Sequence, residues 1–155
     1  VIDADGINVL ERKKSILKEF KGDIVLTPHP GEMARLLGIE IKDVERDRIG
    51  IAKDFAKENG VTVLLKGYNT IITDGDKVFV NPTGNSAMAS GGMGDTLTGI
   101  ITSLISQGVN SFDAAILGAY IHGYIGDELS KENFTVSAME IIKNIPNKIK
   151  ELISF

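Results

Sequence analysis

The chain alternates short apolar runs with helical segments, and this alternation restricts the fold more than any other feature of the sequence. Residues 23–27 and 61–66 are two such runs, each apolar enough to predict a strand buried on both faces. Between them, apolar residues recur on one face of a helix over residues 43–59, and Gly60 follows directly. Strand, helix and strand in this order predict an α/β fold with a mostly parallel sheet.

The remaining segments extend this pattern in both directions, and we expect residues 1–155 to form one folding unit. Residues 1–5 are typical of the end of a buried strand, and residues 7–20 of a first helical segment. Residues 70–73 and 77–80 predict a β-hairpin with Asp74-Gly75 at its turn. Further helices are expected over residues 32–37, from Asp95 to before Gly108, from residue 111 or 112 to 129, and as two short helices over residues 137–153, divided near Pro146.

Polar residues cluster where the expected strands end. Asp3 and Asp5 lie two residues apart at the end of the first strand, hence on one face of it. His29 and Glu32 follow the second strand, and Lys66 follows the third. Ligands of open α/β sheets bind at the carboxyl ends of strands, so these residues predict a binding site. Each has a structural alternative. The aspartates could cap the next helix instead of holding a metal or a hydroxyl group, His29 fits a rigid turn between two prolines, and Lys66 could extend to solvent instead of reaching a phosphate.

A loop of small and turn-forming residues, 81–94, leads into the helix expected from Asp95. Gly91, Gly92 and Gly94 precede that helix, whose free N–H groups and dipole predict an anion site that glycines leave accessible. No Gly-Lys-Ser/Thr follows these glycines, so the loop is not a Walker P-loop. Asp95 has two possible roles: a helix-stabilising carboxylate in the first turn, or a base that takes a proton from a hydroxyl group attacking phosphorus.

Composition excludes several classes of function. Seventeen Lys and Arg against 21 Asp and Glu give a net charge of −4, without the basic field that binding to nucleic acid or an anionic membrane requires. The chain has no cysteine, which excludes disulfides and thiolate chemistry and fits a cytoplasmic location. With only His29 and His122, a multi-histidine zinc site is disfavoured, and we expect His122 to be a packed core or interface residue.

Five motifs occur in one order along the chain: Asp3-Ala-Asp-Gly-Ile-Asn8, Thr27-Pro-His-Pro-Gly-Glu32, Leu65-Lys-Gly-Tyr-Asn-Thr70, Gly84-Asn85 with Gly91-Gly-Met-Gly-Asp95, and Tyr120-Ile-His-Gly123. This joint pattern, which extends over essentially the whole chain, resembles the ADP/ATP-dependent NAD(P)H-hydrate dehydratases, nicotinamide-repair enzymes of the ribokinase-like superfamily. The chain departs from the family at Gly6-Ile7, often Ala-Leu, and at Met93, often Ser. Neither departure removes a functional group.

The resemblance implies a ribokinase-like, three-layer α/β/α fold with a mostly parallel sheet plus a β-hairpin. It implies that Asp95 is the base at the substrate hydroxyl group and that His29 contacts the same substrate. The nucleotide is expected along Lys66, Gly67, Tyr68, Asn69 and Thr70, with Gly94 donating a hydrogen bond to it. The residues expected to support the site are Asp5, Asn8, Glu32, Asn81, Asn85, Gly91 and Gly92.

The reaction implied by the resemblance repairs hydrated NADH and NADPH (NADHX and NADPHX). ADP, or ATP, phosphorylates the ring hydroxyl group, and elimination of phosphate restores the C=C bond. Such a reaction depends on positioning and charge stabilisation, and Mg²⁺ is expected on the nucleotide phosphates without dedicated protein ligands. A homo-oligomer, by resemblance a tetramer, is also expected.

Domains of this family are much longer and begin with further β/α units that form part of the substrate pocket. We therefore expect these residues to keep the nucleotide half of the site and to be poor catalysts alone, with the missing units supplied by a partner segment or a longer chain that also carries a fused epimerase domain. Two other functions fit the same motifs. One is a vitamin-precursor kinase of the same superfamily, and the other is a non-catalytic nucleotide-binding module.

Overall fold

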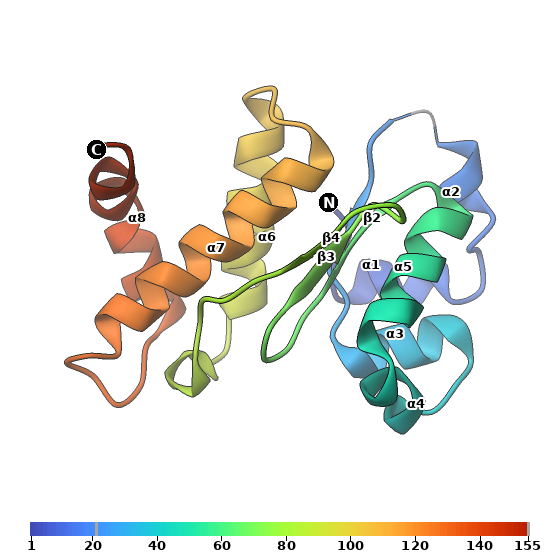
Figure 1. The fold of residues 1–155 in the computed structure, drawn as a ribbon, viewed down its shortest axis with the longest axis horizontal. Helices are drawn as coiled ribbons and strands as arrows, with labels where there is room; N and C mark the ends of the chain where they lie inside the picture. The colour runs from blue at the N-terminus through green and yellow to red at the C-terminus, as the bar shows by residue number, and fades with distance from the viewer. Residues whose placement is uncertain (21, 155) are drawn as a thin grey trace.

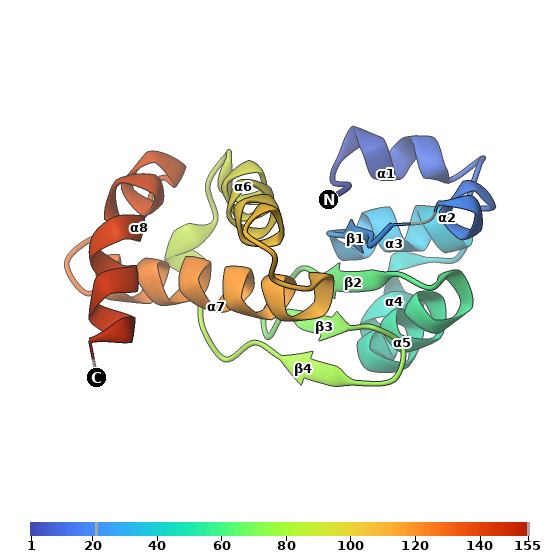
Figure 2. The ribbon, with the colours of Figure 1, turned by 90° about the horizontal axis from the view of Figure 1, so that it is seen from above.

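A four-stranded sheet lies between helices in the computed structural model, which describes residues 1–20 and 22–154 (Figures 1 and 2). Ile2, in the predicted opening strand, forms a single parallel bridge with Leu26. The other predicted strands are confirmed with shorter bounds. They are β1 Val25–Leu26, β2 Thr62–Leu65, β3 Ile71–Thr73 and β4 Val78–Val80, which lie side by side in this order.

The sheet is mixed, so the prediction of a mostly parallel sheet is wrong for the described residues. β1 and β2 pair in parallel, whereas β2 with β3 and β3 with β4 pair antiparallel. A parallel connection needs a crossover of about a dozen residues or more, and only residues 66–70 join β2 to β3. Positive φ angles at Gly67 (143°) and Asn69 (53°) allow this short loop to reverse the chain.

Each face of the sheet carries its own hydrophobic core, because successive side chains of a strand point to opposite faces. Val63 and Leu65 pack on the helices that precede β2, whereas Leu64 packs on the helices that follow the hairpin. The first group is α1 Asp5–Leu10, α2 Ile16–Glu19, α3 Pro30–Leu37, α4 Ile41–Arg46 and α5 Arg48–Asn59, and the second is α6 Met93–Ser106 and α7 Ser111–Leu129. The described residues therefore form three layers.

Two segments that the sequence predicts as single helices are divided in the structure. Residues 43–59 break at Asp47, whose φ is −142° and whose Oδ1 accepts the N–H of Gly50 at 2.9 Å to cap α5. Residues 7–20 form α1 and α2 with a turn between them. In both cases the two pieces pack on the same core, so the apolar pattern continues across the break.

The C-terminal segment is one helix, α8 Ala138–Ile153, rather than two helices divided at Pro146. Its apolar stripe, with Ile141, Ile145 and Ile149, packs against α7 in a third cluster away from the sheet (Figure 1). Burial of this stripe outweighs the backbone hydrogen bond that the proline removes. The 3₁₀ turn η1, Ser86–Met88, also contacts this cluster. Among the described residues, no helix has both the length and the apolar character to cross a bilayer.

Candidate functional site

Lys66 follows β2 directly, and its ammonium group lies between carboxylates from two other segments. Its Nζ is 2.7 Å from Asp3 Oδ1 and 3.9 Å from Glu32 Oε2. Thr98 of α6 donates its hydroxyl hydrogen to the second oxygen of Asp3 at 3.1 Å. The predicted gathering of polar residues at the strand ends is therefore confirmed for Asp3, Glu32 and Lys66.

The carboxyl group of Asp3 is held ionised by this arrangement. Partial burial by itself raises the pKa of Asp3, but the hydrogen bond and charge of Lys66 act in the other direction, with smaller effects from Thr27 and the backbone of Ala4. The net result is a pKa below the ordinary value for aspartate. Asp3 therefore remains an anion that fixes the position of the lysine.

The first turn of α6 lies against the Lys66–Asp3 ion pair. Gly92, the N-cap, has a φ of 83°, and no side chain caps the helix. A Cβ atom on Gly94 would lie 3.4 Å from Asp3 Oδ2 and 3.7 Å from Lys66 Nζ. Uncapped N–H groups and the helix dipole attract anions, so the two features that predict an anion site, the glycine-rich loop and Lys66, are adjacent in space.

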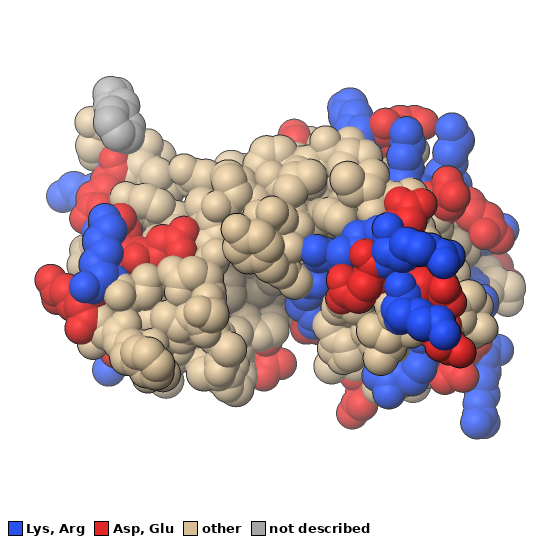
Figure 3. Space-filling view, turned by 60° about the horizontal axis from the view of Figure 1, so that its bottom comes forward, with Lys and Arg blue, Asp and Glu red and all other residues tan. Residues whose placement is uncertain are grey.

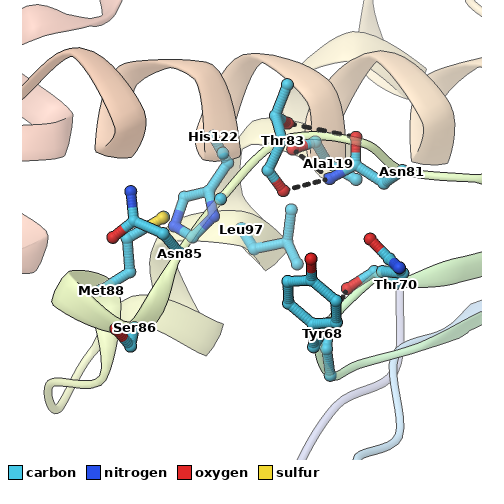
Figure 4. A pocket seen from close by; sticks show the side chains of 14 residues that line it. Tyr68, Thr70, Asn81, Thr83, Asn85, Ser86, Met88, Leu97, Ala119 and His122 are labelled. Carbon is cyan, nitrogen blue, oxygen red and sulfur yellow. Dashed lines mark hydrogen bonds between the residues drawn. The ribbon is translucent and has the colours of Figure 1, made fainter.

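A cavity of about 310 Å³ opens beside the residues that follow Lys66, and its size is typical of a small-molecule site (Figure 4). Four lining residues that were predicted from the nucleotide motif come from the loop between β2 and β3: Gly67, Tyr68, Asn69 and Thr70. The other walls come from the loop after β4, from η1, and from α6 and α7: Asn81, Thr83, Gly84, Asn85, Ser86, Met88, Leu97, Ala119, His122 and Gly123.

Asn81 and Asn85 shape the cavity wall through contacts with the protein itself. Asn81 Nδ2 donates to the carbonyl oxygens of Thr83 (3.0 Å) and Ala119 (3.3 Å), and its Oδ1 accepts the Thr83 hydroxyl at 3.1 Å (Figure 4). Asn85 Nδ2 donates to Asp127 Oδ1 at 2.7 Å. Both asparagines thus fasten the loop to α7. Asp127 was not singled out from the sequence, because its partner lies 42 residues away.

His122 lines the cavity from α7, where the sequence predicted only a packed histidine. It is 9% exposed, and within the described part of the chain its Nε2 is buried without a hydrogen-bond partner. Burial lowers the pKa of His122 from 6.5 to about 4, so its imidazole is neutral at physiological pH. Buried polar atoms are nearly always hydrogen-bonded, and an unpartnered one beside a cavity points to a ligand or a water molecule.

Arg48 of α5 holds the loop that forms one wall of the cavity. Its Nη1 donates to the carbonyl oxygen of Tyr68 at 2.7 Å, and its Nη2 to those of Leu65 and Lys66, each at 3.3 Å. A Cβ atom at Gly67 would lie 2.7 Å from Nη2, so the glycine leaves room for the guanidinium group. Arg48 was not singled out from the sequence, because the carbonyl oxygens that it holds lie 17 to 20 residues away.

His29 and Glu32 form a capping box at the start of α3. His29 Nδ1 accepts the N–H groups of Gly31 (3.0 Å) and Glu32 (3.2 Å), and Glu32 Oε2 accepts the N–H of His29 at 2.7 Å. Because Nδ1 is an acceptor, the neutral ring carries its hydrogen on Nε2, which lies 3.5 Å from Glu32 Oε1. The structure therefore contains the rigid turn between two prolines that the sequence offered as the structural alternative for His29. Substrate contact by His29, whose side chain is 50% exposed, stays a prediction.

Asp95 lies on a different face of α6 from Gly94. Its side chain is exposed, forms no hydrogen bond or ion pair with the described residues, and lines a groove between α6 and α8 rather than the cavity. Asp95 is also the one charged residue from position 78 to position 112, and Figure 3 shows few charged side chains between the two ends of the molecule. The carboxylate of Asp95 thus lies at the start of an uncapped helix without a partner among the described residues.

Three expected supporting residues lie elsewhere. Asp5 and Asn8 are on the exposed side of α1, where Asn8 Nδ2 is 3.4 Å from Asp5 Oδ1. The sequence placed Asp3 and Asp5 on one face of a strand, which is wrong because Ala4, with a φ of 46°, turns the chain into α1 between them. Gly91 is exposed and does not line the cavity.

Comparison with known proteins identifies relatives over most of the chain. A family model described as NAD(P)H-hydrate dehydratase matches residues 1–147. The chain is 49% identical over 133 residues to a bifunctional NAD(P)H-hydrate repair enzyme of Moorella thermoacetica, a match that covers 85% of this chain. It is 40% identical over 141 residues, 89% of its length, to an ADP-dependent (S)-NAD(P)H-hydrate dehydratase of Neisseria meningitidis.

Solved structures show the same fold. An ADP/ATP-dependent NAD(P)H-hydrate dehydratase from Bacillus subtilis, co-crystallised with ATP and Mg²⁺, is 34% identical, with a TM-score of 0.79 over 84% of this chain. A ribokinase-like superfamily protein from Enterococcus faecalis is 30% identical, with a TM-score of 0.80 over 97%. The α/β fold is therefore ribokinase-like. The chain spans 48% and 51% of these two structures, 47% of the Neisseria protein and 25% of the Moorella protein.

Proposed function

The chain belongs to the NAD(P)H-hydrate dehydratase family, and we propose on this premise that it binds ADP or ATP for the dehydration of hydrated NADH and NADPH. The observation that carries the proposal is the position of Lys66. Its ammonium group lies at the uncapped start of α6, and the residues that follow it line the cavity. A nucleotide with its base and ribose in the cavity would thus extend its phosphates toward Lys66.

The names of two relatives support a nucleotide ligand. The Neisseria relative is described as ADP-dependent, and the Bacillus enzyme was co-crystallised with ATP and Mg²⁺. In this chain, the Lys66 ammonium group and the N–H groups that begin α6 suit phosphate oxygens. Because Asp3 holds Lys66 through a 2.7 Å ion pair, the ammonium group is positioned before any nucleotide arrives.

The proposed reaction has two steps. The hydroxyl oxygen of the hydrated ring attacks the terminal phosphorus of ADP, its proton passes to the Asp95 carboxylate, and AMP leaves. The ring C–O bond then breaks with loss of a proton from the neighbouring carbon, which releases phosphate and restores the C=C bond. Asp95 suits the first step because its carboxylate is exposed and has no partner among the described residues.

Mg²⁺ fits this site as an ion held mainly by nucleotide phosphates. Within residues 1–20 and 22–154, no three His, Asp or Glu side chains gather in a way that could hold a metal. Asp3, which faces the start of α6, is already paired with Lys66. When bound, Mg²⁺ would neutralise phosphate charge and polarise the transferred group.

We also propose that His29 contacts the hydrated nicotinamide. Because its Nδ1 accepts two N–H groups of α3, the Nε2–H is the part of the ring that remains to donate to a substrate oxygen. Glu32, which is buried, accepts the backbone N–H of His29 at 2.7 Å and so fixes the backbone that carries the ring.

The substitution Asp95→Asn tests the role of the base. We expect turnover, followed by the returning near-ultraviolet absorbance of the reduced nicotinamide, to fall at least about a hundredfold while ADP still binds. Asp113→Asn is a matched control, because Asp113 is also an exposed aspartate in the first turn of a helix. An Asp95→Asn chain as active as the Asp113→Asn chain contradicts the proposal.

Because the chain spans about half the length of the Neisseria relative, we propose that alone it binds nucleotide but dehydrates the substrate slowly. Calorimetry with ADP measures binding independently of turnover, and full-rate turnover by the chain alone contradicts the second part. Accumulation of a phosphorylated product without reduced nicotinamide indicates a small-molecule kinase instead. If no variant turns over the substrate, and Asp95→Asn leaves the nucleotide-dependent behaviour intact, the chain is a nucleotide-binding module.

A further inference from the structure

The cavity beside the loop after β2 contains a buried ring nitrogen that no other described residue uses. Two polar side chains of the cavity wall are buried, Asn81 at 4% and His122 at 9% exposure. The amide group of Asn81 is engaged at both ends, with Thr83 and with the carbonyl oxygen of Ala119. His122 Nε2 is buried and has no hydrogen-bond partner among the described residues. His122 is therefore the buried polar group of this wall that is left for a ligand.

Glycines of α7 let neighbouring segments pack closely around the imidazole ring. A Cβ atom at Gly123, the next residue, would lie 2.8 Å from the backbone nitrogen of Gly84. A Cβ atom at Gly126, one turn further along the helix, would meet the thioether of Met88. Figure 4 shows the rings and side chains of His122 and Met88 on the same side of the cavity. Close packing therefore holds the ring in place without a hydrogen bond at Nε2.

Apolar side chains from three elements line the cavity together with His122: Met88 of η1, Leu97 of α6 and Ala119 of α7 (Figure 4). A thioether makes favourable contacts with aromatic rings, and aliphatic groups pack well on flat apolar faces. A ribose carries several hydroxyl groups, each of which would need a polar partner here. A nucleobase has apolar faces and polar groups confined to its edge, so this part of the cavity suits the base.

We propose that His122 recognises the adenine base of the nucleotide, with Nε2 accepting a hydrogen bond from the exocyclic amine of the base. The inference rests on the nucleotide binding proposed above. A buried amine needs an acceptor, because an unpaired donor weakens binding. A neutral imidazole has one nitrogen with a free lone pair, and the absence of a partner at Nε2 among the described residues leaves the ring free to carry its hydrogen on Nδ1. Burial, which lowers the pKa of His122 to about 4, keeps the ring neutral.

The contact makes His122 a specificity residue for the base. Phosphates and ribose are common to all nucleoside diphosphates, so the contacts of Lys66 and of the start of α6 cannot select a base. Adenine carries an amine at a position where guanine carries a carbonyl oxygen. An acceptor held at this point of the cavity thus distinguishes nucleotides that the phosphate end of the site treats alike.

Calorimetry of the chain with three diphosphates tests the proposal. ADP is compared with purine riboside 5′-diphosphate, which lacks only the exocyclic amine, and with 2′-deoxy-ADP, which lacks only one ribose hydroxyl group. In the unsubstituted chain, we expect the dissociation constant of purine riboside 5′-diphosphate to exceed that of ADP at least about fivefold. In His122→Phe this ratio should fall to about one, whereas the ratio of 2′-deoxy-ADP to ADP should be the same in both chains.

Two further variants separate recognition from a change in packing. His122→Gln places an amide group near the position of Nε2 and should keep part of the preference for ADP over purine riboside 5′-diphosphate. Ile125→Val alters the packing of α7 at a fully buried residue that does not line the cavity, and it should keep the whole preference. Inorganic pyrophosphate, which has no base, should bind to His122→Phe and to the unsubstituted chain equally.

Equal affinities of the unsubstituted chain for ADP and purine riboside 5′-diphosphate overturn the proposal, and this comparison needs no variant that must fold. A full preference for ADP in His122→Phe also overturns it. A 2′-deoxy-ADP ratio that changes in His122→Phe overturns it as well, because the imidazole then holds the ribose. Each of these results leaves the proposed nucleotide binding in place, whereas absence of ADP binding by the unsubstituted chain contradicts both proposals.

Discussion

The buried imidazole of His122 predicts a loss of stability on mild acidification that the substitution His122→Phe removes. Burial lowers the pKa of His122 in the folded chain from 6.5 to about 4. Between these two values the unfolded chain binds a proton at this position and the folded chain does not. Stability therefore falls as the pH falls from about 6.5 to about 4, and His122 contributes no further change outside that window.

The size of the effect follows from the two pKa values. A shift from 6.5 to about 4 corresponds to about 3 kcal/mol over the full window. Between pH 7 and pH 5, where the chain should remain folded, the same linkage gives about 2 kcal/mol. Asp3 does not add to this loss. Its pKa lies below the ordinary 3.8, so its stabilising contribution is present above that value and is lost only at lower pH.

Urea unfolding of the unsubstituted chain and of His122→Phe at pH 7 and pH 5 provides the measurement. The free energy of unfolding of the unsubstituted chain, relative to the variant, should fall by about 2 kcal/mol between the two pH values. Effects of the carboxylates cancel, because both chains contain them. Phenylalanine resembles imidazole in shape and leaves no buried nitrogen without a partner. The same difference at both pH values refutes the reasoning.

Two further substitutions test the groups around the proposed nucleotide site. Arg48→Met should weaken ADP binding at least about tenfold, because the loop after β2 loses three hydrogen bonds, whereas Arg46→Met, at an 80% exposed side chain, should leave calorimetric affinity unchanged. Lys66→Met should lower the free energy of unfolding by about 1–3 kcal/mol, because Asp3 loses its counter-charge. In the double variant, Asp3→Asn added to Lys66→Met should recover part of the lost free energy of unfolding in urea. Strictly additive effects of the two substitutions contradict an ion pair that contributes to stability.

Features of the fold that depend on neighbouring residues could be predicted from the sequence. The hairpin turn at Asp74-Gly75 is an example: Asp74 Oδ1 accepts the N–H groups of Asp76 and Lys77, and Gly75 has a φ of 97°. Gly60, predicted to follow a helix, has a φ of 64° and ends α5. In these places the residue type and its immediate neighbours determine the backbone.

The mostly parallel character of the sheet was predicted wrongly although the relevant signal was local. Residues 66–70 are too few for a crossover, so an antiparallel pairing was already implied by loop length. The division at Asp47 is different. An Asp inside an apolar pattern is common on a solvated helix face, and only the backbone shows that this one caps α5.

The candidate site shows the same division between local and distant information. Gly67, Tyr68, Asn69 and Thr70 were predicted from one motif because they are consecutive and line one cavity. Arg48 was not predicted, because its role depends on carbonyl oxygens 17 to 20 residues away and leaves no trace in helical periodicity. His122 also had an ordinary structural explanation in an apolar helix. Its unpartnered nitrogen becomes visible only when the surrounding atoms are placed.

The geometry of α6 explains why position 95 suits the proposed base better than a neighbouring position does. Residues four apart lie on nearly the same helix face, and consecutive residues are about 100° apart. Gly94 therefore shares a face with Thr98, against Asp3 and Lys66, while Asp95 shares the next face with Gly99, along the groove. A side chain at 94 would fill the space over Lys66.

The next two positions point inward, because Thr96 is 8% exposed and Leu97 is 7% exposed. A carboxylate at either of these buried positions would lose most of its hydration, which is strongly unfavourable. Position 95 thus combines exposure with closeness to the free N–H groups that begin α6. This helix therefore separates two regions, with the groups suited to phosphate on one face and the candidate base on the other. In the proposed reaction, the phosphoryl group lies at this N-terminus, between the two regions.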